Sequence, residues 1–355
     1  MTLETSPQNS QKIGSINTLR FIAAMFVLFY HFTFVFYYAK TTHIDIPFLR
    51  DMFQYGYLGV ELFFIISGFV ICLSAEHRNG YGFLKSRIGR LYPIFWASAI
   101  ITGIFLVFGG NIINAPLTLD RFLANLTMVP QIVPGNFTLL DPSYWTLAVE
   151  IKFYFVVFLL LILKQFKRIE LLAILSSVGI TLGIVFADMP ITWASYFISG
   201  IIFYKVYKNG LTNWRIFGLC NTLFISIYFA LARIPHQVAN FQGTQFSPAV
   251  ITVYILGFYI LFLLISLNTF RIPNNKYINL LGILTYPLYL LHQQIARVWF
   301  SYGYLKDIPL LISFVIVIAF IFIMSYIIHR LFERHGRVFI DRTLDRVTPK
   351  FIKNL

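Results

Sequence analysis

Arg20 and His31 are the first residues whose types and spacing point to chemistry, because both lie in the apolar stretch 16–38. Ionisable side chains are costly at membrane depth, and they usually mark a functional site there. Their separation of eleven residues is close to three helical turns. Both side chains therefore project from nearly the same helix face, about 16 Å apart along it. Imidazole can take a proton or carry an acyl group near neutral pH, so we predict His31 as catalytic. The alternative is a histidine satisfied by a backbone carbonyl.

Two carboxylates could serve His31. Glu61 follows the start of the apolar stretch 57–74, and Glu150 follows the start of the stretch 145–163. Both carboxylates would reach the membrane depth of His31 if these stretches begin on the side of the membrane where helix 16–38 ends. A carboxylate bonded to an imidazole fixes its tautomer and stabilises the imidazolium. We predict Glu150 as catalytic and Glu61 as catalytic support. Each could instead complement the positive end of its own helix, and which carboxylate serves His31 stays open.

Arg87 and Arg90 lie three residues apart before the apolar stretch 91–110, so they share a helix face. Arginines bind phosphate groups through charge-assisted hydrogen bonds. Together with Arg20, these residues predict a basic mouth that binds an anionic donor. The alternative for Arg87 and Arg90 is a charge that only sets membrane orientation. The alternative for Arg20 is a structural ion pair.

The elements that position these residues are membrane helices. The chain is 58% hydrophobic and 12% charged, its mean hydropathy is +0.74, and a soluble domain carries about twice that charge. Most of the 28 Lys and Arg residues fall in alternate loops, which indicates both termini in the cytosol and argues against nucleic-acid binding. Cys72 and Cys220 lie in different apolar stretches without a metal-binding pattern. We predict an all-α, polytopic helical bundle in one domain, with a core at 16–331 and a basic cytosolic tail at 332–355. The ten predicted spans are 16–38, 57–74, 91–110, 145–163, 170–187, 191–206, 216–232, 248–267, 278–300 and 309–331.

Four segments carry most of the polar groups of the apolar stretches, and a fifth segment, 281–292, follows them later in the chain. The five segments are Asn17 to Arg20 with His31, then 56–68, 83–93, 143–154 and 281–292. In this order they resemble the motifs of acyltransferase family 3, membrane O-acyltransferases that modify sugars of polysaccharides and related acceptors. The chain has Asn17-Thr18 and Glu61 where the family usually has Asp, and it keeps one carboxylate, Glu150, in segment 143–154. These departures bear on the acceptor more than on the reaction.

The resemblance implies an O-acyltransferase, most simply an O-acetyltransferase, in the inner cell membrane. Its donor would be cytosolic acyl-coenzyme A, with no bound cofactor and no metal. Its acceptor would be a sugar or polysaccharide hydroxyl outside the cytosol, free or lipid-linked. Tyr154, Tyr286 and His292 would line the cavity, or would form structural hydrogen bonds instead. The rival interpretation is a secondary transporter for a glycan or small anion, with Arg20 and His31 as a proton relay; no internal repeat supports it.

Overall fold

The computed structural model describes residues 7–40, 45–187, 192–301 and 308–353. The regular structure of these residues is entirely helical. The chain forms two compact units that alternate along the sequence. Unit 1 contains residues 1–23, 57–80 and 153–282, and unit 2 contains residues 24–56, 81–152 and 283–355. The predicted core, 16–331, therefore crosses between the units several times, whereas the predicted tail, 332–355, belongs to unit 2.

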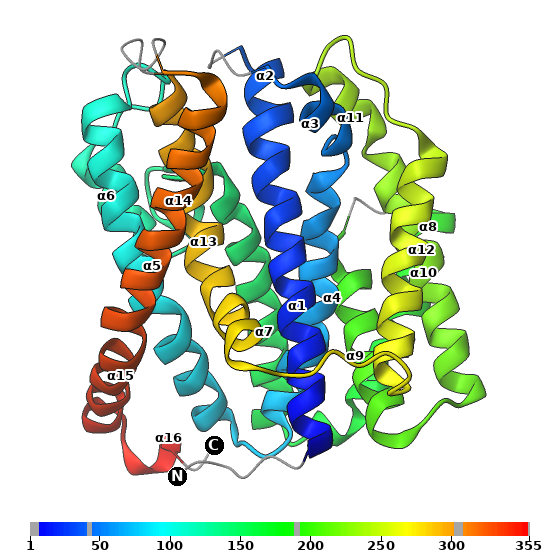
Figure 1. The fold of residues 1–355 in the computed structure, drawn as a ribbon. Helices are drawn as coiled ribbons and strands as arrows, with labels where there is room; N and C mark the ends of the chain where they lie inside the picture. Colours follow the sequence, from blue (N-terminus) through cyan, green and yellow to red (C-terminus); the bar gives the residue numbers. More distant parts are fainter. Residues whose placement is uncertain (1–6, 41–44, 188–191, 302–307, 354–355) are drawn as a thin grey trace. The chain divides into compact units, whose positions relative to one another are not determined.

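Unit 1 is built around α9, which packs against α4, α8, α10 and α12 (Figure 1). Glycine permits the closest of these approaches. A Cβ on Gly68 of α4 would lie 2.3 Å from the carbonyl oxygen of Phe197, and one on Gly200 of α9 would lie 2.3 Å from that of Ile65. Small residues let membrane helices approach this closely. The helices are α4 (Gly59–Ala75), α8 (Ile169–Ala187), α9 (Ala194–Asn209), α10 (Asn213–Ala232), α11 (Ile234–Asn240) and α12 (Pro248–Ser266), with 3-10 turns at Gly56–Leu58 and Phe166–Arg168.

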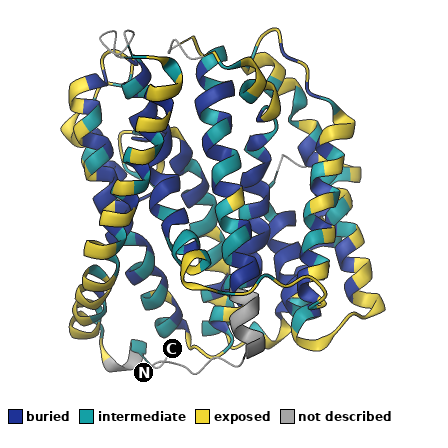
Figure 2. Cartoon of the chain, viewed as in Figure 1, coloured by how far each residue is buried: buried dark blue, intermediate teal, exposed yellow. Residues whose placement is uncertain are grey.

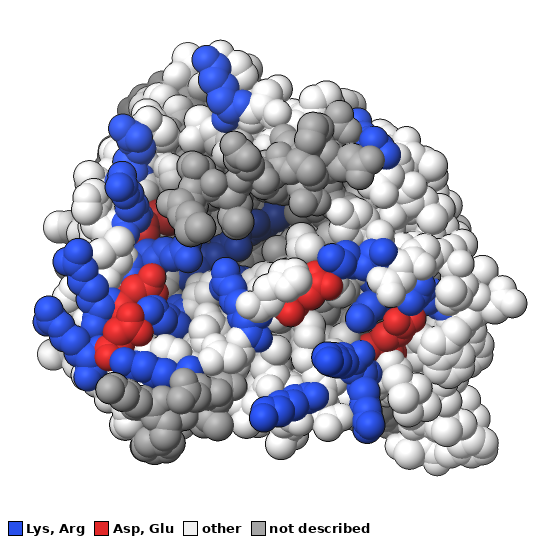
Figure 3. All heavy atoms as spheres, turned by 90° about the horizontal axis from the view of Figure 1, so that it is seen from below, with Lys and Arg blue, Asp and Glu red and all other residues white. Residues whose placement is uncertain are grey.

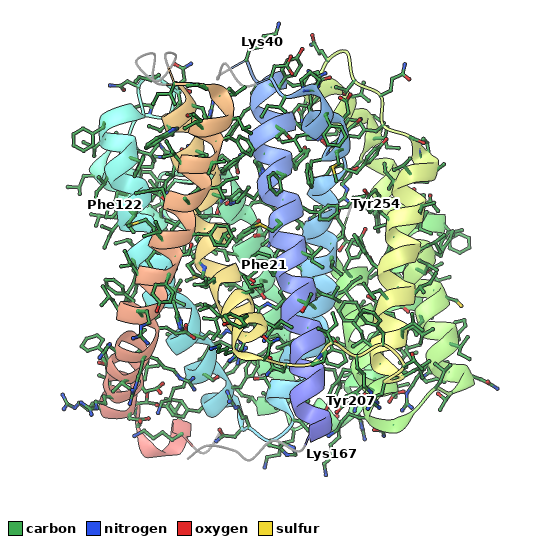
Figure 4. All side chains as sticks on the ribbon, viewed as in Figure 1. Phe21, Lys40, Phe122, Lys167, Tyr207 and Tyr254 are labelled. Atoms are coloured by element: carbon green, nitrogen blue, oxygen red, sulfur yellow. The ribbon has the colours of Figure 1, made fainter. Side chains whose placement is uncertain are left out.

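Aromatic side chains fill much of the space between neighbouring helices (Figure 4). In unit 1, the rings of Phe69 and Tyr207 have centroids 5.9 Å apart, and Tyr207 is labelled in Figure 4. Phe203 and Phe262 lie 5.5 Å apart between α9 and α12. The many Phe and Tyr side chains thus pack in the interior of the unit, where aromatic pairs add stability beyond that of the apolar area they bury.

Unit 2 holds the long helix α5 (Gly80–Gly109), which begins well before the predicted span 91–110. The basic segment 83–90 is therefore helical and continuous with the apolar part. Pro93 lies inside α5, where Gly336 packs against it; a Cβ on Gly336 would lie 2.4 Å from that of Pro93. The other helices of this unit are α2 (Phe36–Tyr38), α3 (Pro47–Met52), α6 (Leu119–Asn125), α14 (Leu310–Ile328), α15 (Arg334–Val347) and α16 (Lys350–Lys353), with 3-10 turns at Pro130–Ile132 and Pro142–Tyr144 and π turns at Tyr30–Val35 and His329–Glu333.

Three helices pass from one unit to the other: α1 (Pro7–Phe29), α7 (Trp145–Ile162) and α13 (Lys276–Ser301). Arg20 consequently belongs to unit 1 and His31 to unit 2. In the same way Glu150 of α7 belongs to unit 2, whereas Tyr154 of α7 belongs to unit 1.

Eight helical segments of the described residues are long and apolar enough to cross a membrane. The exposed residues of α8, α12 and α14 are largely Leu, Ile, Val and Phe, as expected of surfaces that face lipid (Figure 2). The predicted spans 191–206 and 278–300 are also helical, as α9 and α13, although residue 191 lies outside the described residues. The chain is thus an all-helical membrane protein, and the predicted count of ten spans and the cytosolic termini stay predictions.

Besides α6 and two 3-10 turns, the segment between α5 and α7 in unit 2 is held by buried polar side chains. Arg121 of α6 donates to the carbonyl oxygens of Pro116 (2.8 Å) and Thr138 (3.3 Å). Asn125 accepts from the backbone N–H of Leu140 (2.9 Å). Buried backbone groups need such partners, so these two side chains fix the path of the chain toward α7.

Candidate functional site

The structure brings together two predicted site residues of unit 2, His31 and His292. Nδ1 of His31 lies 2.9 Å from Nε2 of His292 and 2.9 Å from the carbonyl oxygen of Val27. Nδ1 of His292 lies 2.6 Å from the carbonyl oxygen of Tyr289. His292 is 1% exposed, whereas His31 is half-buried. The imidazoles therefore form a pair in which only His31 keeps a partly open side.

The carbonyl partners determine which nitrogens carry hydrogen. A carbonyl oxygen only accepts, so Nδ1 of both histidines must be protonated. In a neutral ring, Nε2 of His292 then holds a lone pair, and the single Nδ1 hydrogen of His31 is shared between this lone pair and the carbonyl of Val27. Nε2 of His31 is left with its own lone pair, and it has no hydrogen-bond partner among the described residues. The hydrogen bonds of His31 are therefore made through Nδ1, and Nε2 keeps its lone pair.

A local change of helix type accompanies His31. Residues Tyr30–Val35 form a π turn, in which the N–H of Phe36 bonds the carbonyl of His31. Two side chains of this turn bond carbonyls four residues earlier: His31 bonds Val27, and Thr33 donates to Phe29 at 2.7 Å. Side chains that take backbone acceptors compete with the helix ladder. The loosened ladder is a local reason for the π turn, a feature that often occurs at functional sites.

The predicted donor-binding arginines lie on α5. Arg87 is 7% exposed, and its Nη2 donates to Oγ of Ser86 at 3.2 Å. Arg90 is half-buried. The tail helix α15 packs beside them, because a Cβ on Gly89 would lie 3.3 Å from the side chains of Arg337 and Asp341 of α15.

One ion pair links the same two helices. Lys85 of α5 pairs with Asp345 of α15 at 2.6 Å. Figure 3 shows the end of the molecule that bears α15, where Lys and Arg side chains spread over the surface with Asp and Glu among them. The α5–α15 contact places the basic Arg337 and the acidic Asp341 and Asp345 beside the segment that the sequence predicted for the donor.

In unit 1, Glu61 forms an ion pair with Arg233 of the α10–α11 junction. Glu61 is 1% exposed, and Cζ of Arg233 lies 4.1 Å from the ring centre of Trp193. Sequence reasoning did not predict this partner, which lies 172 residues away along the chain. Removing one partner of such a deeply buried salt bridge strongly destabilises the folded protein, because the other charge stays buried without compensation. The predicted role of Glu61 in catalysis stays a prediction.

The remaining predicted residues are half-buried on their helices. Arg20 lies on α1 and Tyr154 on α7, both in unit 1, and Glu150 lies on α7 in unit 2. Tyr286 donates to the carbonyl oxygen of Leu91 at 3.4 Å, which links α13 to α5. Among the described residues, no three His, Cys, Asp or Glu side chains gather in a way that could hold a metal ion.

The fold and the imidazole pair define the class: a helical membrane protein with two hydrogen-bonded histidines among its apolar helices. The chain belongs to the acyltransferase 3 family, whose acyltransferase-domain profile matches residues 13–330. The match covers the two imidazoles and every other predicted site residue.

Three relatives show what the chain resembles. The exopolysaccharide production protein ExoZ of Rhizobium meliloti is 33% identical over 108 residues, 29% of this chain and 33% of that protein. The peptidoglycan O-acetyltransferase OatA of Listeria monocytogenes is 28% identical over 186 residues, 47% of this chain and 27% of OatA. A protein of the Acidianus two-tailed virus, named provisionally as an acetyltransferase, is 27% identical over 290 residues, 78% of this chain and 81% of its own length. The matched part thus spans a third or less of ExoZ and OatA, and no solved structure matches the chain.

Proposed function

We propose that this protein is a membrane O-acyltransferase that moves an acyl group, most simply acetyl, from acyl-coenzyme A to a sugar hydroxyl. The family supplies the reaction class, and the polysaccharide-related names of ExoZ and OatA favour a sugar acceptor. One observation carries the mechanism: the hydrogen bonds of His31 occupy Nδ1 and leave Nε2 for substrate.

In this proposal, Nε2 of His31 takes the proton of the acceptor hydroxyl as its oxygen attacks the thioester carbonyl carbon. The new C–O bond forms, the C–S bond breaks, and the coenzyme A thiolate leaves and receives the proton. General-base help of this kind contributes about 10²- to 10⁴-fold to a rate. The imidazolium formed on the way keeps its Nδ1 hydrogen, which is shared between the carbonyl of Val27 and Nε2 of His292. A covalent acyl-His31 intermediate uses the same Nε2 lone pair, so the geometry serves both routes.

Arg87 and Arg90 are proposed to bind the phosphates of coenzyme A, since guanidinium groups bind phosphate through paired donors. Both lie on the part of α5 that packs beside α15. Glu150 and Arg20 keep their predicted roles in catalysis and donor binding as part of this proposal. The acceptor is proposed to arrive from outside the cytosol, and the protein to lie in the inner cell membrane.

The test uses the purified full-length protein in lipid vesicles with radiolabelled acetyl-coenzyme A. We expect the labelled acetyl group to pass from coenzyme A to water or to added membrane glycan. His31→Ala should abolish this transfer. An equal rate in His31→Ala of normal expression would refute the catalytic assignment. Uptake of glycan into vesicles without consumption of acetyl-coenzyme A would favour the transporter instead.

A further inference from the structure

The turn of α13 that carries His292 is held by side chains of the segment just before α7. Oδ2 of Asp141 accepts from the backbone N–H of Gln294 at 2.9 Å. The hydroxyl of Tyr144 donates to the carbonyl oxygen of Leu290 at 3.1 Å. Residues 290 and 294 are the acceptor and donor of one ordinary i to i−4 helix bond. Both groups of that bond therefore have a side-chain partner from the same short segment, on either side of His292.

Side chains that insert into a helix ladder change the local path of the helix. They also fix its register. A slip of α13 by one residue would rotate His292 by about 100° and move it by about 1.5 Å along the axis. Asp141 and Tyr144 oppose both movements, since each bonds a backbone group rather than a side chain.

The segment 141–146 is itself rigidly built and buried. Asp141 accepts from the N–H of Ser143 at 2.8 Å and from its hydroxyl at 2.6 Å. Tyr289 donates to the carbonyl oxygen of Ser143 at 3.1 Å and bonds the hydroxyl of Thr146 at 3.0 Å. Asp141 is fully buried, and Tyr144 is 1% exposed. The segment is thus a firm support, and its contacts reach the same α13 residue, Tyr289, whose carbonyl fixes the His292 ring.

We propose that Asp141 and Tyr144 are positioning residues: they hold the α13 turn so that Nε2 of His292 meets Nδ1 of His31. This inference rests on the proposed function for its effect on catalysis. The contacts to α13 do not depend on it. Neither residue touches the reacting atoms in this proposal, so their loss lowers kcat and leaves donor binding intact.

The decisive variant is Tyr144→Phe, which removes one hydroxyl and keeps the ring packed against Phe95, 5.2 Å away. Its matched control is Tyr196→Phe in unit 1. Tyr196 is also 1% exposed, and its hydroxyl also donates to a backbone carbonyl at 3.1 Å, that of Ser226. Both variants lose one buried bond to a backbone carbonyl, so a general structural effect would act on both; Tyr144→Phe also loses the 3.5 Å contact of its hydroxyl with Thr102.

Two measurements are made on the full-length protein: acetyl-coenzyme A kinetics, and NMR spectra of protein labelled with ¹⁵N-histidine. For Tyr144→Phe we expect about tenfold lower kcat, less than the ~100-fold cost of a 1 Å misplacement, with KM for acetyl-coenzyme A within about twofold of wild type. The ring-nitrogen signals of His31 and His292 should shift in Tyr144→Phe and stay in place in Tyr196→Phe. Combined with His292→Leu, Tyr144→Phe should add nothing further, because residues that act as one unit are not additive.

Unchanged kcat and unchanged histidine signals in Tyr144→Phe would overturn the proposal, as would an equal loss in Tyr196→Phe or full additivity with His292→Leu. If the wild type consumed no acetyl-coenzyme A while Tyr144→Phe still shifted the histidine signals, the proposed function would fail and the positioning of His292 would stand. Asp141→Asn provides the second variant. Its amide can replace only one of the two carboxylate acceptors, so the same signals should shift.

Discussion

Replacing His292 with leucine tests the imidazole pair most directly. Leucine keeps most of the buried volume and removes the acceptor that Nε2 of His292 offers to Nδ1 of His31 at 2.9 Å. The carbonyl of Val27 remains, so the tautomer of His31 should persist. The variant therefore loses the hydrogen bond from Nδ1 of His31 to Nε2 of His292, and the His31 ring becomes charged during the reaction.

The size of the effect follows from that bond. Hydrogen bonds to charged groups contribute about 1.5–3 kcal/mol. At 1.36 kcal/mol per factor of ten, the loss is about 10- to 150-fold in kcat. His31→Ala, which removes the base itself, should cost more, up to about 10⁴-fold. His292→Gln, whose amide oxygen can also accept, should recover part of the loss.

The assay is acetyl-coenzyme A turnover by the full-length protein in vesicles, with expression and thermal unfolding measured in parallel. His335→Leu is the matched control, because Nδ1 of His335 also bonds a carbonyl four residues earlier, that of Leu331, on the exposed helix α15. It should leave kcat unchanged. A kcat for His292→Leu within threefold of wild type would refute the reasoning, since Val27 would then suffice to support His31.

Three further predictions concern folding, each measured by thermal unfolding in detergent. Arg233→Leu should destabilise unit 1 by about 3–5 kcal/mol, because it leaves Glu61 charged and buried; an effect below about 1 kcal/mol would mean that the pair is solvated. Gly68→Ala should lower the unfolding temperature, because its Cβ would lie 2.3 Å from a carbonyl oxygen, whereas Gly179→Ala, with nothing within 4 Å, should be neutral or stabilising; equal effects would contradict the close approach. Burial raises the pKa of Asp141, which precedes the apolar helix, from 3.8 to about 6. The folded state therefore holds this proton more tightly, so stability should fall by up to about 3 kcal/mol as pH rises from about 4 to about 6, and Asp141→Asn should flatten that slope.

The sequence predicts the helices well because apolar stretches of membrane length have few other solutions. All ten predicted spans contain a helix in the structure. The predicted membrane span 91–110 begins after Lys85, Arg87 and Arg90, whose charges lower the local hydropathy, and α5 carries these residues on its first turns as a continuous helix. Pro93 did not end the helix either.

The contacts of the site were harder to predict. His31 and His292 are 261 residues apart along the chain, so their bond depends on packing that no local pattern reveals. Each was predicted as a site residue by its own segment, and the pairing was not. Asp141 was missed because it lies in a stretch rich in Pro, Gly and Asn that predicts irregular structure. A buried Asp just before a Pro-Ser turn was the available signal, since Asp commonly caps such turns.

The neutral partner of His31 has a consequence for the electrical balance of the reaction. A carboxylate beside the imidazole would give the site a permanent negative charge, whereas the His292 ring brings none. Within the imidazole pair, the positive charge gained by His31 has no negative partner, and it is matched by the negative charge that develops on the substrate. Opposite charges that arise together in a poorly polarisable interior attract each other strongly. The imidazole pair therefore begins and ends each turnover without a net charge of its own, so any carboxylate that stabilises the imidazolium must come from outside the pair, the role that the proposal gives to Glu150.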